Sequence, residues 1–189
     1  MAIEAHKVMD KKRSKRGVTF LEIMVVIAIV AILAILALPS LGEWKRKFDI
    51  ETTIRTAFNA LNEARMTAFS QKRVCGLVWS GVPITSVSLK CDGLPDGTNQ
   101  DGDITDATDQ VLWTKRFKVP LQSDFPNNRC VFTYKGFADS IENGLSDTTP
   151  RRHLYYGNES DSEYSCVAVS LVRIKMGEWD LDNNTCILK

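Results

Sequence analysis

The sequence predicts an α+β protein in which one long N-terminal helix, a membrane half followed by an amphipathic half, packs on a mainly antiparallel β-sheet. Three observations favour this class. An uninterrupted apolar run covers Ile23–Leu38, an apolar stripe with steps of three and four follows it as far as Gln71, and short β-rich runs separated by turn residues fill the rest of the 189-residue chain. A helix followed by successive strands is the order typical of an α+β domain, and the length leaves room for one modest core.

The apolar run follows a basic leader. Residues 1–17 carry a local net charge of +4, which leaves −3 for the remaining chain, and Glu22 is the only charged residue between Val18 and Gly42. The 16 residues of the run come close to the roughly 20 that cross a bilayer. By the positive-inside tendency, the leader stays cytoplasmic and the C-terminal body is exported. A cleaved secretory signal peptide is the alternative. The apolar run is long for such a peptide, and cleavage after Ala37 would place Ile35 at the −3 position, where a small residue is usual.

Glu22 lies directly before this apolar run, near the hydrocarbon of the predicted membrane. An unpaired charge at such a position is energetically costly and usually marks a function. The segment Gly17–Glu22, with the sequence GVTFLE, and the apolar helix after it resemble the class III signal of type IV pilins and pseudopilins. The resemblance implies that a prepilin peptidase cuts between Gly17 and Val18 and N-methylates Val18. It also implies assembly roles for Glu22, as the partner of the new amino group on a neighbouring subunit, and for Pro39, where pilins often carry a helix-kinking proline. Val18 departs from the family pattern, in which Phe is commonest.

The same resemblance organises the whole chain. It implies a prepilin leader peptide over 1–17, a transmembrane and filament-core helix over 18–40, an amphipathic helix half over 41–72 and a periplasmic β-rich domain over 73–189. The stretches LNEARMTAFSQKRVCGLV and FTYKGFAD are similar to the GspH/FimT-like subgroup of minor pilins and pseudopilins. We therefore expect a pilin-like fold in this domain.

The expected function is that of a structural subunit. The resemblance implies a minor pilin or pseudopilin that initiates or caps a type IV pilus or a type II secretion pseudopilus, and it leaves the two machines open. The implied partners are other pilins or pseudopilins in a helical filament, prepilin peptidase, the inner-membrane assembly platform, and membrane lipid before assembly. The implied location is the bacterial inner membrane, with one span, a cytoplasmic N-terminus and a periplasmic C-terminal domain, and afterwards the pilus or pseudopilus.

The soluble part is expected to hold five to seven strands on the amphipathic helix. We expect the apolar stripe of that helix to pack in the core; its members are Leu41, Trp44, Phe48, Ile54, Phe58, Leu61 and Ala64 or Ala68. The expected strands are Val74–Trp79, Ile84–Lys90, Val111–Val119, Cys130–Tyr134, Tyr164–Ile174 and Thr185–Leu188.

Five cysteines lie in the predicted periplasmic domain, and they allow at most two disulfides in an oxidising compartment. Hairpin pairing of neighbouring strands favours the pairs Cys75–Cys91 and Cys166–Cys186, with Cys130 free and buried. Five reduced core cysteines are the alternative. The absence of a C-x-x-C pair and the presence of only two histidines in the chain argue against zinc.

The loop Asp92–Asp109 concentrates aspartates and glycines, and oxygen-rich loops of this kind bind Ca²⁺. Asp101, Asp103 and Asp109 are the weak candidate ligands. The EF-hand template fails, because a loop that starts at Asp101 places Asp106 where glycine is required. We expect a solvated loop and no cofactor, with calcium as the less favoured alternative.

Two further functions are considered. Arg151, Arg152, Arg173 and Lys175 are candidates for a small basic patch, and some FimT-like pilins are DNA receptors. A DNA receptor for uptake is therefore the alternative function. The acidic body and the lack of interleaved aromatic and basic residues do not favour it. Catalysis is not expected, because the body has one histidine and neither a Ser-x-x-Lys nor a G-x-S-x-G motif.

Overall fold

The computed structural model describes residues 17–93, 100–106 and 108–189, apart from the side chains of residues 35–40. The chain divides into two compact units, Met1–Gly42 and Glu43–Lys189. The first unit contributes the beginning of one long helix, α1 (Phe20–Gln71), and the second holds the rest of α1 with every strand that is described. The end of α1 at Gln71 is the residue that the apolar stripe predicts.

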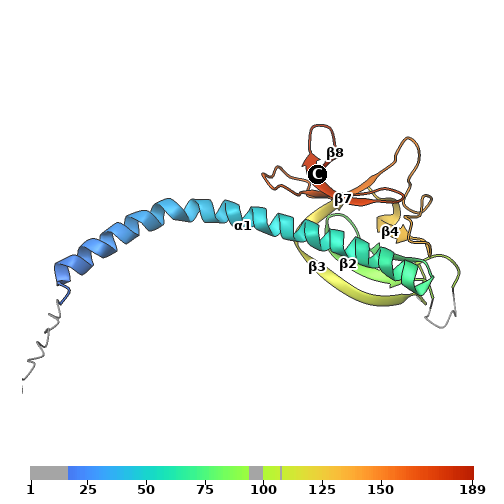
Figure 1. Ribbon diagram of the computed structural model, residues 1–189, viewed down its shortest axis with the longest axis horizontal. Coiled ribbons are helices and arrows are strands. Elements are labelled where there is room, and N and C mark those ends of the chain that lie inside the picture. The colour runs from blue at the N-terminus through green and yellow to red at the C-terminus, as the bar shows by residue number, and fades with distance from the viewer. Residues whose placement is uncertain (1–16, 94–99, 107) are drawn as a thin grey trace, which may run out of the picture. The chain divides into compact units, whose positions relative to one another are not determined.

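The second unit is built on a sheet of eight strands. All neighbouring pairs are antiparallel, and the strand order is β4-β1-β2-β3-β5-β6-β7-β8 (Figure 1). The strands are β1 (Cys75–Val78), β2 (Ile84–Cys91), β3 (Gln110–Ser123), β4 (Arg129–Phe132), β5 (Arg152–Tyr155), β6 (Cys166–Val169), β7 (Ile174–Asp180) and β8 (Thr185–Leu188), with a 3-10 turn at Pro126–Asn128 before β4. A long helix on an antiparallel sheet confirms the predicted α+β class.

The long strand β3 joins the two halves of this sheet. Its first twelve positions run along β2, and only Gln122 and Ser123 at its end pair with β5. The register between β2 and β3 shifts at two places, between Ile84 and Ser86 and between Leu89 and Lys90. Such irregularities increase local twist, so one continuous strand serves two four-stranded halves that differ in direction.

The core lies between α1 and one face of the sheet. The buried face of the helix repeats with helical spacing and consists largely of small and branched residues: Ile50, Ile54, Ala57, Ala60, Leu61, Ala64 and Ala68 are each at most 1% exposed. They pack in one cluster with Leu77, Val87, Leu121, Phe132 and Val167 from the strands. The alanines let the helix backbone approach the sheet closely. At Gly76 in β1, between β2 and β4, an added Cβ would lie 2.5 Å from the Cys130 carbonyl oxygen, so β1 is tightly enclosed.

Several expectations about the elements are wrong. The sheet has eight strands, because β5 was not expected and the predicted strand Tyr164–Ile174 is two strands, β6 and β7, with a turn between them. The turn forms because Ser170 donates from its backbone N–H and its hydroxyl to the carbonyl of Arg173. Trp44 and Phe48 are 65% and 52% exposed and stack on each other, since the buried face of α1 begins only at Ile50.

Candidate functional site

The predicted processing site lies where α1 begins. Gly17, Val18 and Thr19 precede the first helical residue, Phe20, and all four are exposed. The Thr19 hydroxyl accepts a hydrogen bond of 3.2 Å from the backbone N–H of Glu22. Thr19 is thus the N-cap, and Thr19-x-x-Glu22 has the sequence of a capping box with an acid in the first turn. The peptide bond between Gly17 and Val18 lies in non-helical chain directly before a capped helix start.

Helix α1 has an unusual surface in its first turns. Its large apolar residues between Phe20 and Leu33 are each 47% to 79% exposed, and they face all sides of the helix. A helix that is apolar all round is normally buried, either in lipid or among other helices. In this chain alone nothing in the described residues covers it. Glu22, in its first turn, is exposed as well.

The structure describes only part of the segment that is predicted to cross the membrane. None of the helical segments with described side chains is both long enough and apolar enough to cross a bilayer. The end of the predicted run, including Ala37 and Leu38, and the predicted assembly residue Pro39 fall among residues 35–40, whose side chains lie outside the description. The backbone of α1 is helical through Pro39.

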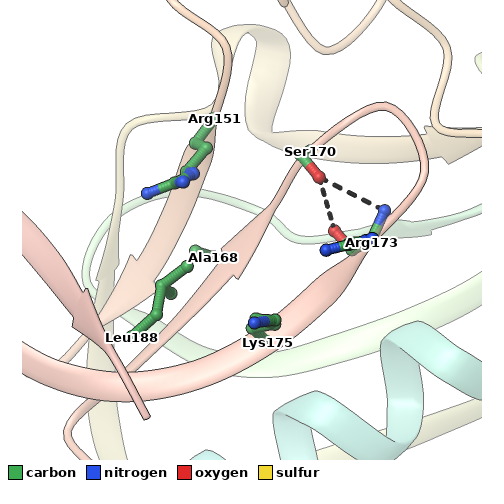
Figure 2. A pocket seen from close by; sticks show the side chains of 6 residues that line it. All are labelled: Arg151, Ala168, Ser170, Arg173, Lys175 and Leu188. Carbon is green, nitrogen blue, oxygen red and sulfur yellow. Dashed lines mark hydrogen bonds between the residues drawn. The ribbon is translucent and has the colours of Figure 1, made fainter.

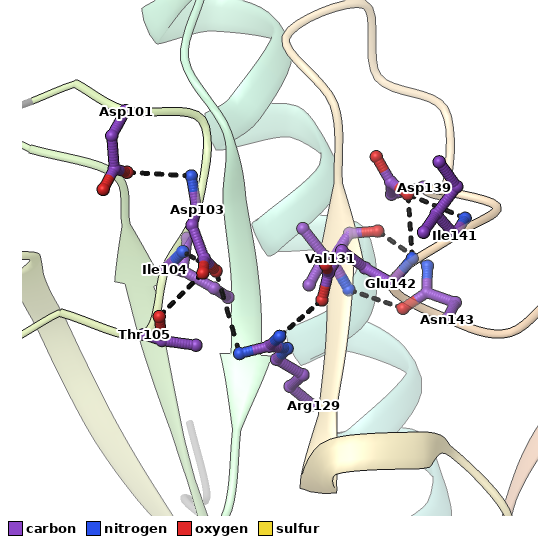
Figure 3. A network of polar contacts seen from close by, with 10 residues as sticks. All are labelled: Asp101, Asp103, Ile104, Thr105, Arg129, Val131, Asp139, Ile141, Glu142 and Asn143. Carbon is purple, nitrogen blue, oxygen red and sulfur yellow. Dashed lines mark hydrogen bonds and ion pairs between the residues drawn. The ribbon is translucent and has the colours of Figure 1, made fainter.

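The candidate calcium residues have partners within the protein, and Figure 3 shows those of Asp101 and Asp103. The Asp101 carboxylate accepts from the N–H of Asp103, and the Asp103 carboxylate accepts from the N–H of Ile104 and the hydroxyl of Thr105. Burial opposes ionisation of Asp103, but the Thr105 and Ile104 hydrogen bonds and the charge of Arg129 together lower its pKa. Asp109 accepts from the N–H of Gly93 at 3.3 Å.

These contacts tie the loop to the sheet. Arg129 on β4 lies 3.7 Å from Asp103 and 2.6 Å from Glu142, and so links the loop to the turn that follows β4. The nearby charge of Asp101 raises the pKa of Asp106, as expected for carboxyl groups that lie close together. Within the part of the chain that the structure describes, no three His, Cys, Asp or Glu side chains are placed to hold a metal ion.

Two disulfides close the domain. Cys75 is bonded to Cys91 across β1 and β2, and Cys166 is bonded to Cys186, while Cys130 is a buried free thiol. These are the pairs that the sequence analysis favours. Burial raises the pKa of the Cys130 thiol well above its usual range, so it is an inert core residue rather than a nucleophile.

The predicted basic patch is partly assembled. Arg151, Arg173 and Lys175 line a pocket of about 80 Å³ with Ala168, Ser170 and Leu188 (Figure 2). With the described carboxylates these three cations form no salt bridge. An arrangement of this kind suits a small anion, because the repulsion among the cations is relieved when a negative charge enters.

Arg152 does not belong to this pocket. Its guanidinium donates to three backbone carbonyls, those of Asp124, Asn143 and Gly144, at 2.9 to 3.2 Å. Arg152 is also absent from the residues that line the pocket. The assignment of Arg152 to the patch is therefore wrong, and its side chain supports the loop instead.

Sequence reasoning missed two residues that position these features. Arg73 is 3% exposed and donates to Gln71, to the Gly93 carbonyl and to Gln110, which fastens the acidic loop beneath the end of α1. Thr19 was not recognised as a cap. The pattern Thr-x-x-Glu before an apolar run is a known capping signature and could have identified it.

Comparisons with known proteins agree with the N-terminal site. Residues 12–38 match the family model described as the prokaryotic N-terminal methylation motif. Two crystal structures of the type IV minor pilin FimU from Pseudomonas aeruginosa (strain PAO1) are similar to this chain at 16% sequence identity. The structure in space group P21 covers 71% of this chain and 92% of its own, with a TM-score of 0.47, and the one in space group P65 covers 68% and 92%, with a TM-score of 0.45. A search of curated proteins found no match.

The matched motif therefore lies at a capped helix start, followed by a helix with exposed apolar residues on all sides.

Proposed function

We propose that the protein is a minor pilin or pseudopilin, a structural subunit that initiates or caps assembly of a type IV pilus or of a type II secretion pseudopilus. The observation that carries this proposal is the exposed apolar surface of α1 that begins three residues after Gly17. A helix of this composition requires lipid or other helices around it, and a subunit that leaves the membrane for a filament core meets both environments in turn.

Processing is proposed between Gly17 and Val18, with N-methylation of Val18. The bond lies in non-helical chain, which suits a peptidase that must bind an extended substrate. At Gly17 an added Cβ meets no described atom within 4 Å, so the described chain does not itself require glycine there. The glycine is then a requirement of the peptidase.

Glu22 is proposed to pair with the amino group that cleavage creates at Val18 of a neighbouring subunit. Both groups would leave water for an apolar surrounding, where an ion pair is strong but a single unpaired charge is costly. The pair would therefore favour one axial register of neighbouring helices. The small residues Ala28, Ala31 and Ala34 would permit close approach of those helices. Pro39 is proposed as a second assembly residue, because a proline inside a helix favours a kink.

The test is co-production of the full chain with a prepilin peptidase. We expect the mass to fall by about 1.9 kDa, from 17 residues at roughly 110 Da each, and the new terminus to be N-methyl-Val18. The variant Gly17→Val is the control, which should remain at full length. An unchanged mass of the wild-type chain, with a known prepilin processed in the same cells, would exclude the proposed class of function.

A DNA receptor remains the second candidate, and the pocket of Arg151, Arg173 and Lys175 is the observation that favours it. Phosphate contacts would make binding weaken steeply with salt. The double variant Arg151→Ala/Arg173→Ala should then lose affinity at low salt, whereas Arg152→Ala should act through folding. Equal DNA binding by the wild type and the double variant would remove this candidate.

A further inference from the structure

An exposed apolar surface lies at the C-terminal end of α1, and we call it the helix-end surface. Three segments meet there. The Cβ position of Gly136 lies 3.4 Å from Phe69 Cβ, Arg65 donates to the Val172 carbonyl at 3.1 Å, and the Ala138 N–H donates to the Leu171 carbonyl at 2.9 Å. Six large side chains of these segments are 43% to 62% exposed: Met66, Phe69, Tyr134, Phe137, Leu171 and Val172. Contiguous apolar surface of this kind marks an interaction site.

The helix-end surface is also strongly basic. Residues 65–72, 133–138 and 170–173 carry four cations and no carboxylate; the cations are Arg65, Lys72, Lys135 and Arg173. Lys72 Nζ lies 3.9 Å from the centre of the Phe69 ring, and Lys135 Nζ lies 5.5 Å from that of Tyr134. Lys72 and Lys135 therefore border the apolar side chains directly. A complementary partner presents an apolar side chain flanked by carboxylates.

The chain itself carries such a partner at the other end of β7. The last residue of β7, Asp180, and the turn 181–184 after it are here called the acidic turn, in which Leu181 is 43% exposed between Asp180 and Asp182. Residues 180–184 contain no lysine or arginine. The side chain of Asn183 and the N–H groups of Asn183 and Asp182 donate to the Asp180 carboxylate and lower its pKa, so Asp180 is negative at neutral pH.

The placement of the two surfaces excludes a contact within one molecule. The turn Ser170–Arg173, part of the helix-end surface, precedes β7, and the acidic turn follows it. The seven residues of β7 span about 23 Å, so the surfaces lie at opposite ends of one rigid strand. Two complementary surfaces that face apart on one subunit join neighbouring subunits head to tail, and such a contact does not close on itself.

We propose that the acidic turn of one copy of this protein docks on the helix-end surface of a second copy. Leu181 packs among Phe69, Phe137 and Leu171, and the flanking carboxylates meet the bordering cations. The proposal rests on the proposed function as a filament subunit. A single turn buries less area than a stable dimer in solution needs, so the contact acts between subunits that their N-terminal helices already hold together, at high effective concentration.

The experiment is cysteine cross-linking of the full chain in the cells that produce it. The double variant Phe137→Cys/Leu181→Cys, treated with a short bismaleimide, should give covalent dimers and higher oligomers, whereas each single variant should give none. The matched control is Val82→Cys/Leu181→Cys, since Val82 is exposed to a similar extent, 46%, in a different turn. A third variant, Ala28→Cys, reports whether neighbouring helices meet at all.

Each outcome decides the proposal. Absence of oligomers from Phe137→Cys/Leu181→Cys overturns it; if Ala28→Cys still cross-links, or the chain is still cleaved at Gly17, the filament function stands, and it fails only where both are absent. Dimers from Phe137→Cys alone show a face-to-face pair and overturn the proposal, as does an adduct of Phe137→Cys with a different protein. Equal yields from the test pair and the Val82 control show proximity without docking, which also overturns it.

Charge reversal provides the second measurement. Lys135→Glu in the double-cysteine background should lower the cross-linking yield about twofold to fivefold, as expected for a rim charge. Adding Asp182→Lys to the same chain should restore the cross-linking yield. The acidic turn then presents a lysine at position 182 to the glutamate at position 135 of the neighbouring copy. Lys47→Glu, on an exposed part of α1 more than a dozen residues before Arg65, is the control and should leave the yield unchanged. Loss of yield without restoration would contradict the pairing of Lys135 with Asp182.

Discussion

The first turns of α1 and the second unit of the chain differ in what stabilises them. Between Phe20 and Leu33 the apolar side chains are exposed, and the local order comes from backbone hydrogen bonds and the Thr19 cap. In the second unit, residues such as Ile54 and Leu77 are fully buried, and two disulfides close the sheet. The same kind of side chain therefore serves folding in one region and the proposed association in the other, and substitutions should separate the two.

The largest difference is expected for one isoleucine in each region. Ile54→Ala removes a fully buried side chain and should lower the free energy of unfolding of the second unit by about 2 to 5 kcal/mol. Ile29→Ala, at a position 53% exposed, should leave that value unchanged. Denaturant unfolding of the full chain in detergent, followed by the tryptophan signal, measures both. Equal losses in the two variants would show that the regions fold as one unit.

The next effect concerns the disulfides. Cys166→Ser/Cys186→Ser opens a loop of 20 residues and should cost about 3 kcal/mol of stability, measured in the same unfolding experiment. Thiol counting checks the covalent state. We expect no reactive thiol in the native protein, one after denaturation, and five after denaturation with reductant. Three reactive thiols without reductant would mean that one of the pairs is not formed.

The sequence predicted the two regions unequally, for a physical reason. The segment Gly17–Glu22 is recognisable because the residues of the proposed processing and assembly sites appear in one short string. The end of α1 at Gln71 was also predictable, because the helical period stops there. Trp44 and Phe48 fit the same period but are exposed, since the position at which a sheet begins to cover a helix depends on distant residues.

The strands were harder to predict. Residues 164–174 appeared to be one apolar run, because Leu171 and Val172 in the turn are as apolar as the strands around them. In the structure these two residues are exposed and belong to the helix-end surface. Polar turn residues normally separate the apolar residues of two strands. Here the turn between β6 and β7 is apolar, because it contributes to the proposed helix-end surface. Strand β5 was missed for the opposite reason, since Arg152 and His153 make it look like a loop.

A smaller effect separates two readings of Glu22. Thr19→Ala removes the helix cap and should cost about 1 kcal/mol at the start of α1. If Glu22 acted only in the capping box, Thr19→Ala and Glu22→Gln would impair filament incorporation alike. We expect Glu22→Gln to abolish or strongly impair incorporation after normal cleavage at Gly17, and Thr19→Ala to leave it largely intact. Immunoblotting of sheared filaments and of membranes measures both, and equal defects would assign Glu22 to capping.

The smallest effect tests the second unit through its pH dependence. The pKa of Glu63 on α1 lies below its ordinary value near 4.5. A hydrogen bond from Lys115 lowers it most, burial opposes this change, and a hydrogen bond from Trp113 and the charge of Lys115 lower it further. A carboxyl group whose pKa is lower in the folded state contributes stability above the unfolded pKa and loses it as the pH falls through the folded pKa. Glu63 is 45% exposed at its side chain, so the contribution is below about 1 kcal/mol.

Glu63→Gln should therefore lower the unfolding midpoint slightly at pH 7 and have a smaller effect at pH 3, where the wild-type carboxyl group also becomes neutral. The matched control is Glu51→Gln, which changes the charge of α1 equally but not the contact with β3. Because Glu63 joins α1 to β3 within the second unit, its titration should affect unfolding without changing association of the N-terminal helices. A Glu63→Gln variant that unfolds like the wild type at pH 7 but assembles poorly would contradict the division of roles between the two regions.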